Sequence, residues 1–263
     1  MKQIGIIGVG HLGSAILQGL IFSQYVTPQD VFISGGTSGK TQQIAKELDC
    51  QFCLTNRAVV EQTDIIILAV IPRILPSVLE EIKPYLSGNQ MIISTAASFT
   101  MAQIQEILTS HQAIIRAIPN IPSRVCQGMT AISPAKQVTN KQLEIVKQLF
   151  MAIGKIAIVD ESKLDISSTI AGCSPAYVAL FIEALADAGV LAGLTREEAY
   201  LMSKQAVLGS ASVLLAQSML PAELKDGVCS PGGTTIRGIA QLEKYGLRNA
   251  VIEAVKASAK IKA

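Results

Sequence analysis

Residues 3–13, Gln3-Ile-Gly-Ile-Ile-Gly-Val-Gly-His-Leu-Gly13, decide the fold of this chain. They begin with a short apolar run that is typical of a buried strand, and Gly8, Gly10 and Gly13 then fit the pattern G-x-G-x-x-G. A segment with helical character, Leu12 to Ile21, continues from the last glycine. A strand, a glycine turn and a helix in this order predict a dinucleotide-binding α/β domain.

Each glycine has a separate task in such a unit. Gly8 permits the tight turn, Gly10 lets the pyrophosphate approach the backbone, and Gly13 packs the helix on the strand. The helix then directs its free N–H groups and the positive end of its dipole toward the phosphates. We therefore expect the cofactor to contact Gly8, Gly10, His11, Leu12 and Gly13. His11 is expected on the solvent side of the turn, because the pyrophosphate separates it from the nicotinamide.

The first 160 residues alternate short apolar runs with helical segments. Runs such as Ile65–Val70 are almost continuously apolar, which suits strands that are covered on both faces of a parallel sheet. This alternation predicts a doubly wound, Rossmann-type sheet in a domain of residues 1–160. Strands are expected at Gln3–Gly8, Val31–Ser34, Phe52–Leu54, Ile65–Val70, Met91–Ser94, Ile114–Ile118 and Met129–Ile132.

Residues 161–263 have a helical pattern throughout. Ser174-Pro175 predicts an N-cap and a first helical turn, and this helix is expected to run to Gly193. Thr195 to Glu198 has the spacing of a capping box and predicts a second long helix, which Pro221 is expected to end. The region is small and rich in Ala, Leu and Val, so we expect it to complete its core against a second subunit. The expected fold class is α/β, a Rossmann-type sheet followed by an all-helical dimerisation domain.

The end of the second strand bears on the choice of nicotinamide cofactor. An acidic residue there binds the ribose 2′-OH of NAD. This chain has Ser34-Gly-Gly-Thr-Ser-Gly-Lys40 instead, whose hydroxyls, glycine N–H groups and lysine favour NADP(H), with NAD(H) possible. The nicotinamide is expected at the carboxyl ends of later strands, near Ala69-Val70 and Thr95-Ala96-Ala97, where small side chains leave room. Ordinary packing at strand ends would also explain these small residues.

A second glycine-rich stretch, Asp226-Gly-Val-Cys-Ser-Pro-Gly-Gly-Thr-Thr-Ile-Arg-Gly238, interrupts the helical half. Two glycines and two threonines stand directly before a helical run, Ile236 to Tyr245. A glycine turn at a helix N-terminus can hold a small carboxylate, and the hydroxyls of Ser230, Thr234 and Thr235 can hydrogen-bond a neighbouring polar atom. The alternative is a Pro-Gly turn between two helices with no ligand.

Charge and composition limit the classes of partner. Hydrophobic residues make up 49% of the chain and charged ones 16%, which predicts a large core or subunit interface, and the net charge of +2 gives no reason to expect nucleic acid or an anionic membrane. Residues 205–222 carry no charge, but five polar residues interrupt them and no basic cluster flanks one side, so a helix between subunits is favoured over a membrane span.

Five cysteines and the N-terminal residues indicate a cytoplasmic protein. The first residues lack the build of a signal peptide, and an odd number of cysteines then argues for reduced thiols. Cys50-Gln-Phe-Cys53 has the spacing of a redox or zinc pair. It is expected on a strand, where these two side chains face opposite sides, and no second pair exists to complete a zinc site. No metal is expected.

The chain resembles the pyrroline-5-carboxylate reductases almost from end to end. The most specific part is Ser230-Pro-Gly-Gly-Thr-Thr235 with the helical run after it. The resemblance implies NAD(P)H-dependent reduction of the C=N bond of 1-pyrroline-5-carboxylate to L-proline, the last step of proline biosynthesis, in a homodimer or larger homo-oligomer. Supporting parts are the N-terminal glycine motif, Asn56, Ala69-Val-Ile-Pro72, Pro119-Asn120, Ser174-Pro-Ala-Tyr177 and Glu183-Ala-Leu-Ala-Asp-Ala-Gly189.

The resemblance also implies roles for particular residues. Thr235 would hydrogen-bond the ring nitrogen of the substrate as the catalytic residue, and Glu161 would border the substrate pocket. That pocket would lie where the cofactor domain of one subunit meets the helical dimer. The residues implied to bind substrate are Glu161, Ser230, Gly232, Gly233, Thr234 and Thr235; Ser34 and Asn56 would lie near the adenosine, and Ala69, Val70, Ala96 and Ala97 beside the nicotinamide.

Three departures from the family pattern leave another function open. The family commonly has lysine at the position of Ile71, Ser-Gly-Ser-Gly before Pro-Ala-Tyr where this chain has Ala-Gly-Cys173-Ser, and often an amide at Gly227. A non-catalytic NADP(H)-binding relative that acts by protein contacts is therefore a second hypothesis. A β-hydroxyacid dehydrogenase is disfavoured. In enzymes of that class a catalytic lysine follows a glycine-rich segment at helical spacing, whereas the first lysine after Gly172 in this chain is Lys204.

Overall fold

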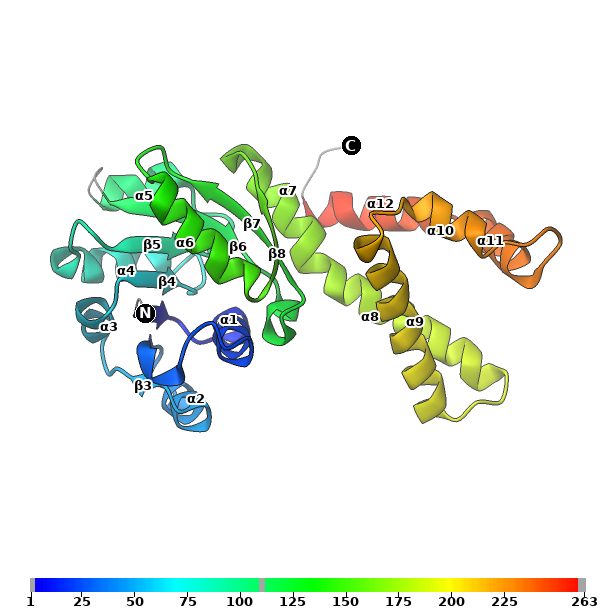
Figure 1. The fold of residues 1–263 in the computed structure, drawn as a ribbon, viewed down its shortest axis with the longest axis horizontal. Coiled ribbons are helices and arrows are strands. Elements are labelled where there is room, and N and C mark those ends of the chain that lie inside the picture. The colour runs from blue at the N-terminus through cyan, green and yellow to red at the C-terminus, as the bar shows by residue number, and fades with distance from the viewer. Residues whose placement is uncertain (1–2, 109–111, 260–263) are drawn as a thin grey trace. The chain divides into compact units, whose positions relative to one another are not determined.

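The structure, a computed structural model, describes residues 3–108 and 112–259. The chain divides into two compact units, Met1–Gly172 and Cys173–Ala263 (Figure 1). The boundary by contacts therefore lies later than residue 160, the boundary expected from the sequence. The intervening segment packs with the first unit because Leu164 is fully buried beside Ile118 and Ala131.

The first unit is built on one eight-stranded sheet with the order β3-β2-β1-β4-β5-β6-β7-β8. The seven strands predicted from the sequence are present, and an eighth, β8, was missed. β7 pairs with β6 antiparallel and β8 pairs with β7 parallel, so the last two strands run opposite to the others. The sheet is therefore mixed. Its strands are β1 Ile4–Ile7, β2 Val31–Ser34, β3 Gln51–Phe52, β4 Ile65–Leu68, β5 Met91–Ser94, β6 Ala113–Ile118, β7 Gly128–Pro134 and β8 Gly154–Ile158.

Helices cover both faces of this sheet. Residues of α1 and α6, such as Leu17 and Phe150, share one apolar core with β1 and β2, and residues of α3, α4 and α5, such as Leu79, share a second core with β4. Burial on both faces explains why β1 and β4 are buried at all four positions and read as continuous apolar runs. The helices are α1 His11–Phe22, α2 Lys40–Leu48, α3 Asn56–Gln62, α4 Leu75–Ile82, α5 Met101–Ile107 and α6 Asn140–Met151.

The turn between β1 and α1 depends on a close approach of two backbone segments. A Cβ atom on Gly13 would lie 2.1 Å from the carbonyl oxygen of Gly8, and Gly8 itself has a φ of +95°. Gly10 differs, since its φ is −79° and an added Cβ would meet no heavy atom within 4 Å. Packing within the chain therefore explains Gly8 and Gly13 but not Gly10.

The path from the sheet into the second unit is helical without a break. α7 (Leu164–Ser168) and a π-helical turn (Thr169–Cys173) lead directly into α8 (Ser174–Leu191). The prediction that a helix begins with Ser174 as its N-cap was therefore wrong. Pro175 has no N–H to donate to the carbonyl of Ala171. Asn120 Nδ2 donates to that carbonyl instead, at 2.8 Å, which satisfies the acceptor and lets the helical path continue.

The second unit consists of helices alone. The capping box at α9 (Arg196–Ala216) is confirmed, since Thr195 N–H donates to Glu198 Oε2 at 2.9 Å and Glu198 N–H donates to Thr195 Oγ1 at 3.3 Å. α9 ends before Pro221, which instead begins α10 (Pro221–Gly227), because proline suits the first helical position. α11 (Thr234–Lys244) and α12 (Leu247–Ser258) follow.

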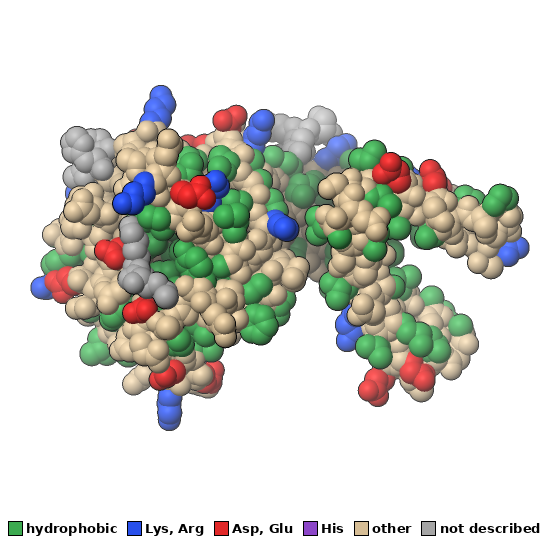
Figure 2. Space-filling model, viewed as in Figure 1, with side chains coloured by type: hydrophobic (Ala, Val, Ile, Leu, Met, Phe, Trp, Pro, Cys, Tyr) green, Lys and Arg blue, Asp and Glu red, His purple; other side chains and the backbone are tan. Residues whose placement is uncertain are grey.

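Apolar side chains of the second unit are largely exposed. Among the described residues of α8 to α12, only Ala186, Ala199 and Ser203 are buried. Leu191 is 89% exposed and Leu215 69%, and Figure 2 shows apolar side chains at the surface of this unit. The helical stretch Glu161–Leu191 is also long and apolar enough to cross a membrane by length and composition alone. Apolar faces of this extent require a cover.

We expect Gly13→Ala to destabilise the first unit, because its Cβ would overlap the carbonyl oxygen of Gly8. The expected loss is about 1–3 kcal/mol in the free energy of unfolding, as for other overpacked sites, measured by urea denaturation. Gly10→Ala is the matched control, since the same methyl group meets nothing there. Equal unfolding midpoints for the two variants would contradict this account of the turn.

Candidate functional site

The carboxyl ends of four parallel strands lie in one row. Ile7 pairs with Ser34 on one side and with Leu68 on the other, and Leu68 pairs with Ser94. The loops that follow β1, β2, β4 and β5 therefore leave the sheet at the same edge. The chain leaves β1 toward β2 and later returns to β4 on the other side of β1, so this edge contains the switch point where open α/β sheets bind ligands.

The glycine turn offers uncapped N–H groups at this edge. Gly8 N–H donates to the Ser34 carbonyl at 2.9 Å, which fixes the turn over the ends of β1 and β2. α1 begins at His11 with Gly10 as its N-cap; no side chain caps it, and its first turn carries no acidic residue. His11 is exposed and Leu12 half-buried. A helix N-terminus in this state can accept a pyrophosphate, and no heavy atom lies within 4 Å of the place that a Cβ on Gly10 would take.

Ser34 and Asn56, both expected at the adenosine end, lie together. Ser34 Oγ donates to Asn56 Oδ1 at 2.7 Å, and Asn56 Nδ2 donates to Glu81 Oε2 at 2.7 Å. Ser34 is 1% exposed, so its hydroxyl mainly orients Asn56, which is only half-buried. The Glu81 carboxylate comes from α4 and was not identified from the sequence, because nothing in its spacing connects it to Asn56.

The next loops along the edge carry small side chains. Ala69 follows β4, and its carbonyl oxygen would lie 2.8 Å from a Cβ on Gly8, so the two loops are adjacent. Thr95 Oγ1 donates to the Leu68 carbonyl at 3.2 Å, which ties the loop after β5 to the end of β4. Val70 and Ala97 are half-buried and Ala96 is 2% exposed. The structure thus brings Ala69 and Val70 to the glycine turn and ties the loop of Ala96 and Ala97 to the same edge.

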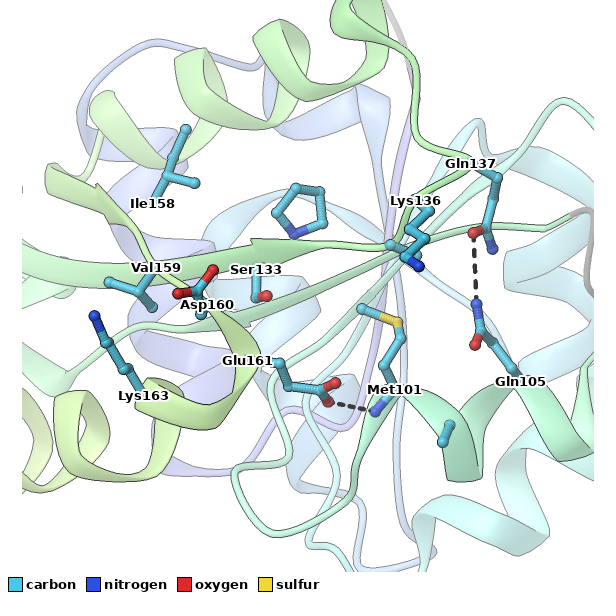
Figure 3. A pocket seen from close by; sticks show the side chains of 13 residues that line it. Met101, Gln105, Ser133, Lys136, Gln137, Ile158, Val159, Asp160, Glu161 and Lys163 are labelled. Carbon is cyan, nitrogen blue, oxygen red and sulfur yellow. Dashed lines mark hydrogen bonds between the residues drawn. The ribbon is translucent and has the colours of Figure 1, made fainter.

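Glu161 lines a cavity of about 860 Å³ between α5, the end of β7 and the residues after β8 (Figure 3). Of the predicted site residues only Glu161 lines it, together with residues such as Ser133, Lys136, Asp160 and Lys163. The Glu161 carboxylate accepts hydrogen bonds from Met101 N–H at 2.5 Å and from Arg116 Nη1 at 2.7 Å. One oxygen of Glu161 is therefore already engaged within the first unit.

The predicted carboxylate-binding turn has the required local form. Gly232 has a φ of +68°, and Gly233 is the N-cap of α11. No side chain caps this helix, and its first turn holds no acidic residue. Gly233 N–H donates to the Ser230 carbonyl at 3.0 Å, which closes the turn. Thr234 and Thr235 begin the helix and are exposed, so their N–H and hydroxyl groups are open to a ligand.

Cys50 and Cys53, the two cysteines with the spacing of a redox or zinc pair, lie where burial disfavours the thiolate. All five are free thiols. Burial raises the pKa of the Cys50 thiol to about 11, and burial also raises the pKa of Cys53. Because the thiolate is the nucleophile and the metal ligand, both groups stay protonated and unreactive near neutral pH. Over residues 3–108 and 112–259, no group of His, Cys, Asp and Glu side chains is arranged to hold a metal ion.

Arg116, which binds Glu161, is another residue that the sequence analysis did not identify, as was Glu81. It lies on β6, within the buried run Ala113–Ile118. A signal was present, because a charged residue in a strand that is otherwise apolar is rarely left without partners. Its partners, however, come from two loops far away in the sequence, which no local pattern connects to it.

Comparison with known proteins identifies both parts of the chain. A family model described as pyrroline-5-carboxylate reductase dimerisation matches residues 161–263. A second, described as NADP oxidoreductase coenzyme F420-dependent, matches residues 3–98. The pyrroline-5-carboxylate reductase of Escherichia coli is 40% identical over 97% of this chain and 94% of its own length. That of Arabidopsis thaliana is 35% identical over 98% of this chain and 93% of its own.

Solved structures agree with these matches. The pyrroline carboxylate reductase of Plasmodium falciparum, solved with NADP bound, has a TM-score of 0.88 and 32% identity over 98% of this chain and 96% of its own. A 3-hydroxyisobutyrate dehydrogenase from Mycobacterium tuberculosis, at 14% identity and a TM-score of 0.54 over 73% of this chain and 65% of its own, shares the fold alone. Near-complete coverage at up to 40% identity shows that this chain belongs to the pyrroline-5-carboxylate reductase family.

Proposed function

We propose that this protein reduces the C=N bond of 1-pyrroline-5-carboxylate to L-proline with NAD(P)H, the last step of proline biosynthesis. The observation that carries the proposal is the uncapped N-terminus of α11 behind the Ser230–Gly233 turn. It is a site for a small carboxylate, and it occurs in a chain of this family whose other half has the form of a nucleotide-binding sheet.

The first unit supplies the nucleotide site. N–H groups at the start of α1 bind the pyrophosphate, and the absence of a Cβ at Gly10 lets it approach. Asn56, held by Ser34 and Glu81, faces the adenosine end. Ala69, Val70, Ala96 and Ala97 border the nicotinamide, where their small size leaves room for the ring. When bound, the reduced nicotinamide supplies a hydride. The full set proposed to contact the cofactor is Gly8, Gly10, His11, Leu12, Gly13, Ser34, Asn56, Ala69, Val70, Ala96 and Ala97.

The second unit supplies the substrate site. N–H groups of Gly232, Gly233 and Thr234 bind the carboxylate, and the Ser230 hydroxyl lies beside the same turn. Thr235 hydrogen-bonds the ring nitrogen. In the reaction the imine carbon gains a hydride and the nitrogen keeps its proton, so the C=N bond becomes CH–NH. Because a protonated imine is already a good hydride acceptor, the protein's contribution is alignment and neutralisation of the carboxylate, and no strong side-chain acid is required. Glu161 is proposed to border the substrate pocket.

NADP(H) is the proposed preferred form of the cofactor, with NAD(H) as a second substrate. The loop after β2 exposes Thr37, Ser38, Gly39 and Lys40. α2 begins at Lys40, has Gly39 as its N-cap, and has neither a capping side chain nor an acidic residue in its first turn. These groups suit a 2′-phosphate. Glu81, the carboxylate that Asn56 binds, would repel a 2′-phosphate. We therefore expect a partial rather than an absolute preference for NADP(H) over NAD(H).

The chain forms homo-oligomers through its second unit. The family model over residues 161–263 is one of dimerisation, and apolar side chains such as Leu191 and Leu215 are exposed on this unit. We propose a homodimer as the minimal form, in which the partner subunit covers these side chains and also accounts for the apolar stretch Glu161–Leu191. The proposal includes a cytoplasmic location, in keeping with free thiols, and no membrane or nucleic-acid partner.

Consumption of NADPH measured at 340 nm, with 1-pyrroline-5-carboxylate as substrate and L-proline identified as product, tests the proposed function. A relative that only binds the nucleotide would bind NADPH but leave it unoxidised when the imine is added. That result would replace the proposed reaction with a binding role.

Lys40→Gln is expected to lower kcat/KM with NADPH about fivefold and to leave kcat/KM with NADH unchanged, since one exposed ion pair contributes about 1 kcal/mol. Parallel assays with the two cofactors measure this. Lys46→Gln is the control, because Lys46 is an exposed lysine in the last turn of the same helix. An equal loss with both cofactors would remove Lys40 from the 2′-phosphate site.

Thr235→Val is expected to lower kcat about tenfold, because it removes one hydrogen bond to the reacting nitrogen while keeping the shape of the side chain. Thr235→Ser keeps the hydroxyl and should retain most of the turnover. Steady-state constants of the valine variant that match those of the wild type would show that Thr235 has no such role.

Gly233→Val is expected to raise KM for the imine about tenfold or more by crowding the carboxylate turn, where an added Cβ already lies 2.3 Å from Ser230 Oγ. Gly238→Val, on the same helix, is the control, since its Cβ meets nothing within 4 Å. The carboxylate assignment fails if KM and kcat of the Gly233 variant stay unaltered.

A further inference from the structure

Arg116 is a buried charge at the cofactor edge of the sheet. Its side chain is 3% exposed, and Arg116 lies directly beside Ser94 in the paired strands β6 and β5. A buried charge is costly unless its donors are paired. The partners of Arg116 therefore show where this cost is offset.

Two of those partners are carbonyl groups of the loop after β5. Arg116 Nη2 donates to the carbonyl of Ala96 at 3.3 Å and also to the carbonyl of Ala97. Other contacts also hold this loop: Thr95 N–H and Oγ1 donate to the Leu68 carbonyl, Ala96 N–H donates to Ser94 Oγ at 3.4 Å, and the Ala96 side chain packs in the apolar core.

The third partner fixes the far end of the same loop. Arg116 Nη1 donates to Glu161 Oε1 at 2.7 Å, and this one oxygen also accepts from Met101 N–H, the first residue of α5, at 2.5 Å. Figure 3 shows the Glu161 carboxylate directed at Met101. One guanidinium therefore holds residues 96–101 at both ends, directly at Ala96 and Ala97 and through Glu161 at Met101.

Neutralising the charge does not by itself explain this arrangement. Arg116 Nε is buried and has no hydrogen-bond partner among the residues that the structure describes. An unsatisfied buried donor costs about 1–3 kcal/mol. The side chain thus forgoes one hydrogen bond while its two terminal nitrogens span the loop and Glu161. Lysine has a single terminal nitrogen and cannot make the same spread of contacts.

We propose that Arg116 is a positioning residue for hydride transfer: it fixes the loop of residues 96–101 so that Ala96 and Ala97 form a rigid wall beside the nicotinamide ring. The proposal rests on the proposed function, in which these two alanines border that ring. Arg116 itself touches neither the cofactor nor the substrate.

The test compares Arg116→Met with Glu161→Gln in the full-length protein. Both variants break the ion pair, but only Arg116→Met removes the contacts to the Ala96 and Ala97 carbonyls. Dissociation constants are measured without substrate for NADPH, by its fluorescence, and for 2′-phospho-ADP-ribose, which lacks the nicotinamide ring, by calorimetry.

We expect Arg116→Met to weaken NADPH binding about tenfold and to change binding of the ring-free fragment by less than about twofold. Turnover should fall by about 10- to 100-fold, because a misplacement of about 1 Å can cost about 100-fold in rate. Glu161→Gln should weaken NADPH binding clearly less than Arg116→Met, since Oε1 still accepts from both partners. Arg116→Lys should also bind NADPH more weakly than the wild type, because lysine cannot make the same contacts.

Three results would overturn the proposal. Equal weakening of NADPH by the methionine and glutamine variants would assign the effect to the ion pair rather than to the loop. Equal weakening of NADPH and the fragment would show a general loss of the nucleotide site. Unchanged NADPH binding with a lowered unfolding temperature would leave Arg116 a structural role alone. If Arg116→Met does not fold, the comparison is made with Arg116→Lys, whose wild-type binding would equally overturn the proposal.

These binding measurements are independent of the reaction. Wild-type protein that binds NADPH but does not oxidise it with 1-pyrroline-5-carboxylate would sink the proposed function. The difference between NADPH and the ring-free fragment would still test whether Arg116 fixes the wall beside the ring.

Discussion

The close approach of α1 to the turn after β1 is the contact on which the cofactor half depends. With 2.1 Å between the carbonyl oxygen of Gly8 and the place of a Cβ on Gly13, only two glycines allow the helix to start directly above the strand end. That start directs the uncapped N–H groups over the switch point of the sheet. In our proposal the adjacent loops at Ala69 and Thr95 need only small side chains, because backbone N–H groups at the start of α1 bind the pyrophosphate.

The chain uses the same physical device a second time, in a different setting. At α1 close packing requires a glycine at Gly13 but not at Gly10. At α11 a Cβ on Gly232 would meet no heavy atom within 4 Å and its left-handed φ of +68° is the demand, while a Cβ on Gly233 would lie 2.3 Å from Ser230 Oγ. Both helices begin without a capping side chain or an acidic residue. An anion at each start satisfies N–H groups that the fold leaves open. One anion is the pyrophosphate in our proposal, and the other is the substrate carboxylate.

Local patterns in the sequence predicted the features that depend on interactions between neighbouring residues. The glycine turn, the buried strands and the capping box at Thr195 depend on neighbouring residues, and all three are present in the structure. The missed features depend on distant ones. β8 is a half-exposed edge strand whose apolar run, residues 156–158, was not recognised as a strand, and the helix through Ser174 continues because Asn120 satisfies the carbonyl that Pro175 leaves free. Arg116 and Glu81 meet their partners only when folding brings residues that are distant in the sequence together.

The second unit, which carries the proposed substrate site, depends on association with a partner subunit. Its five helices bury almost no large apolar side chain among the described residues, so one chain contributes too little apolar burial to offset the entropy of ordering them. The dimerisation family model that matches residues 161–263 indicates that a partner subunit covers these helices. α11, which carries the Ser230–Gly233 turn at its start, is one of these helices. In our proposal, the apolar contacts that join the subunits also maintain the geometry of the carboxylate site, so conditions that dissociate the subunits are expected to loosen that site.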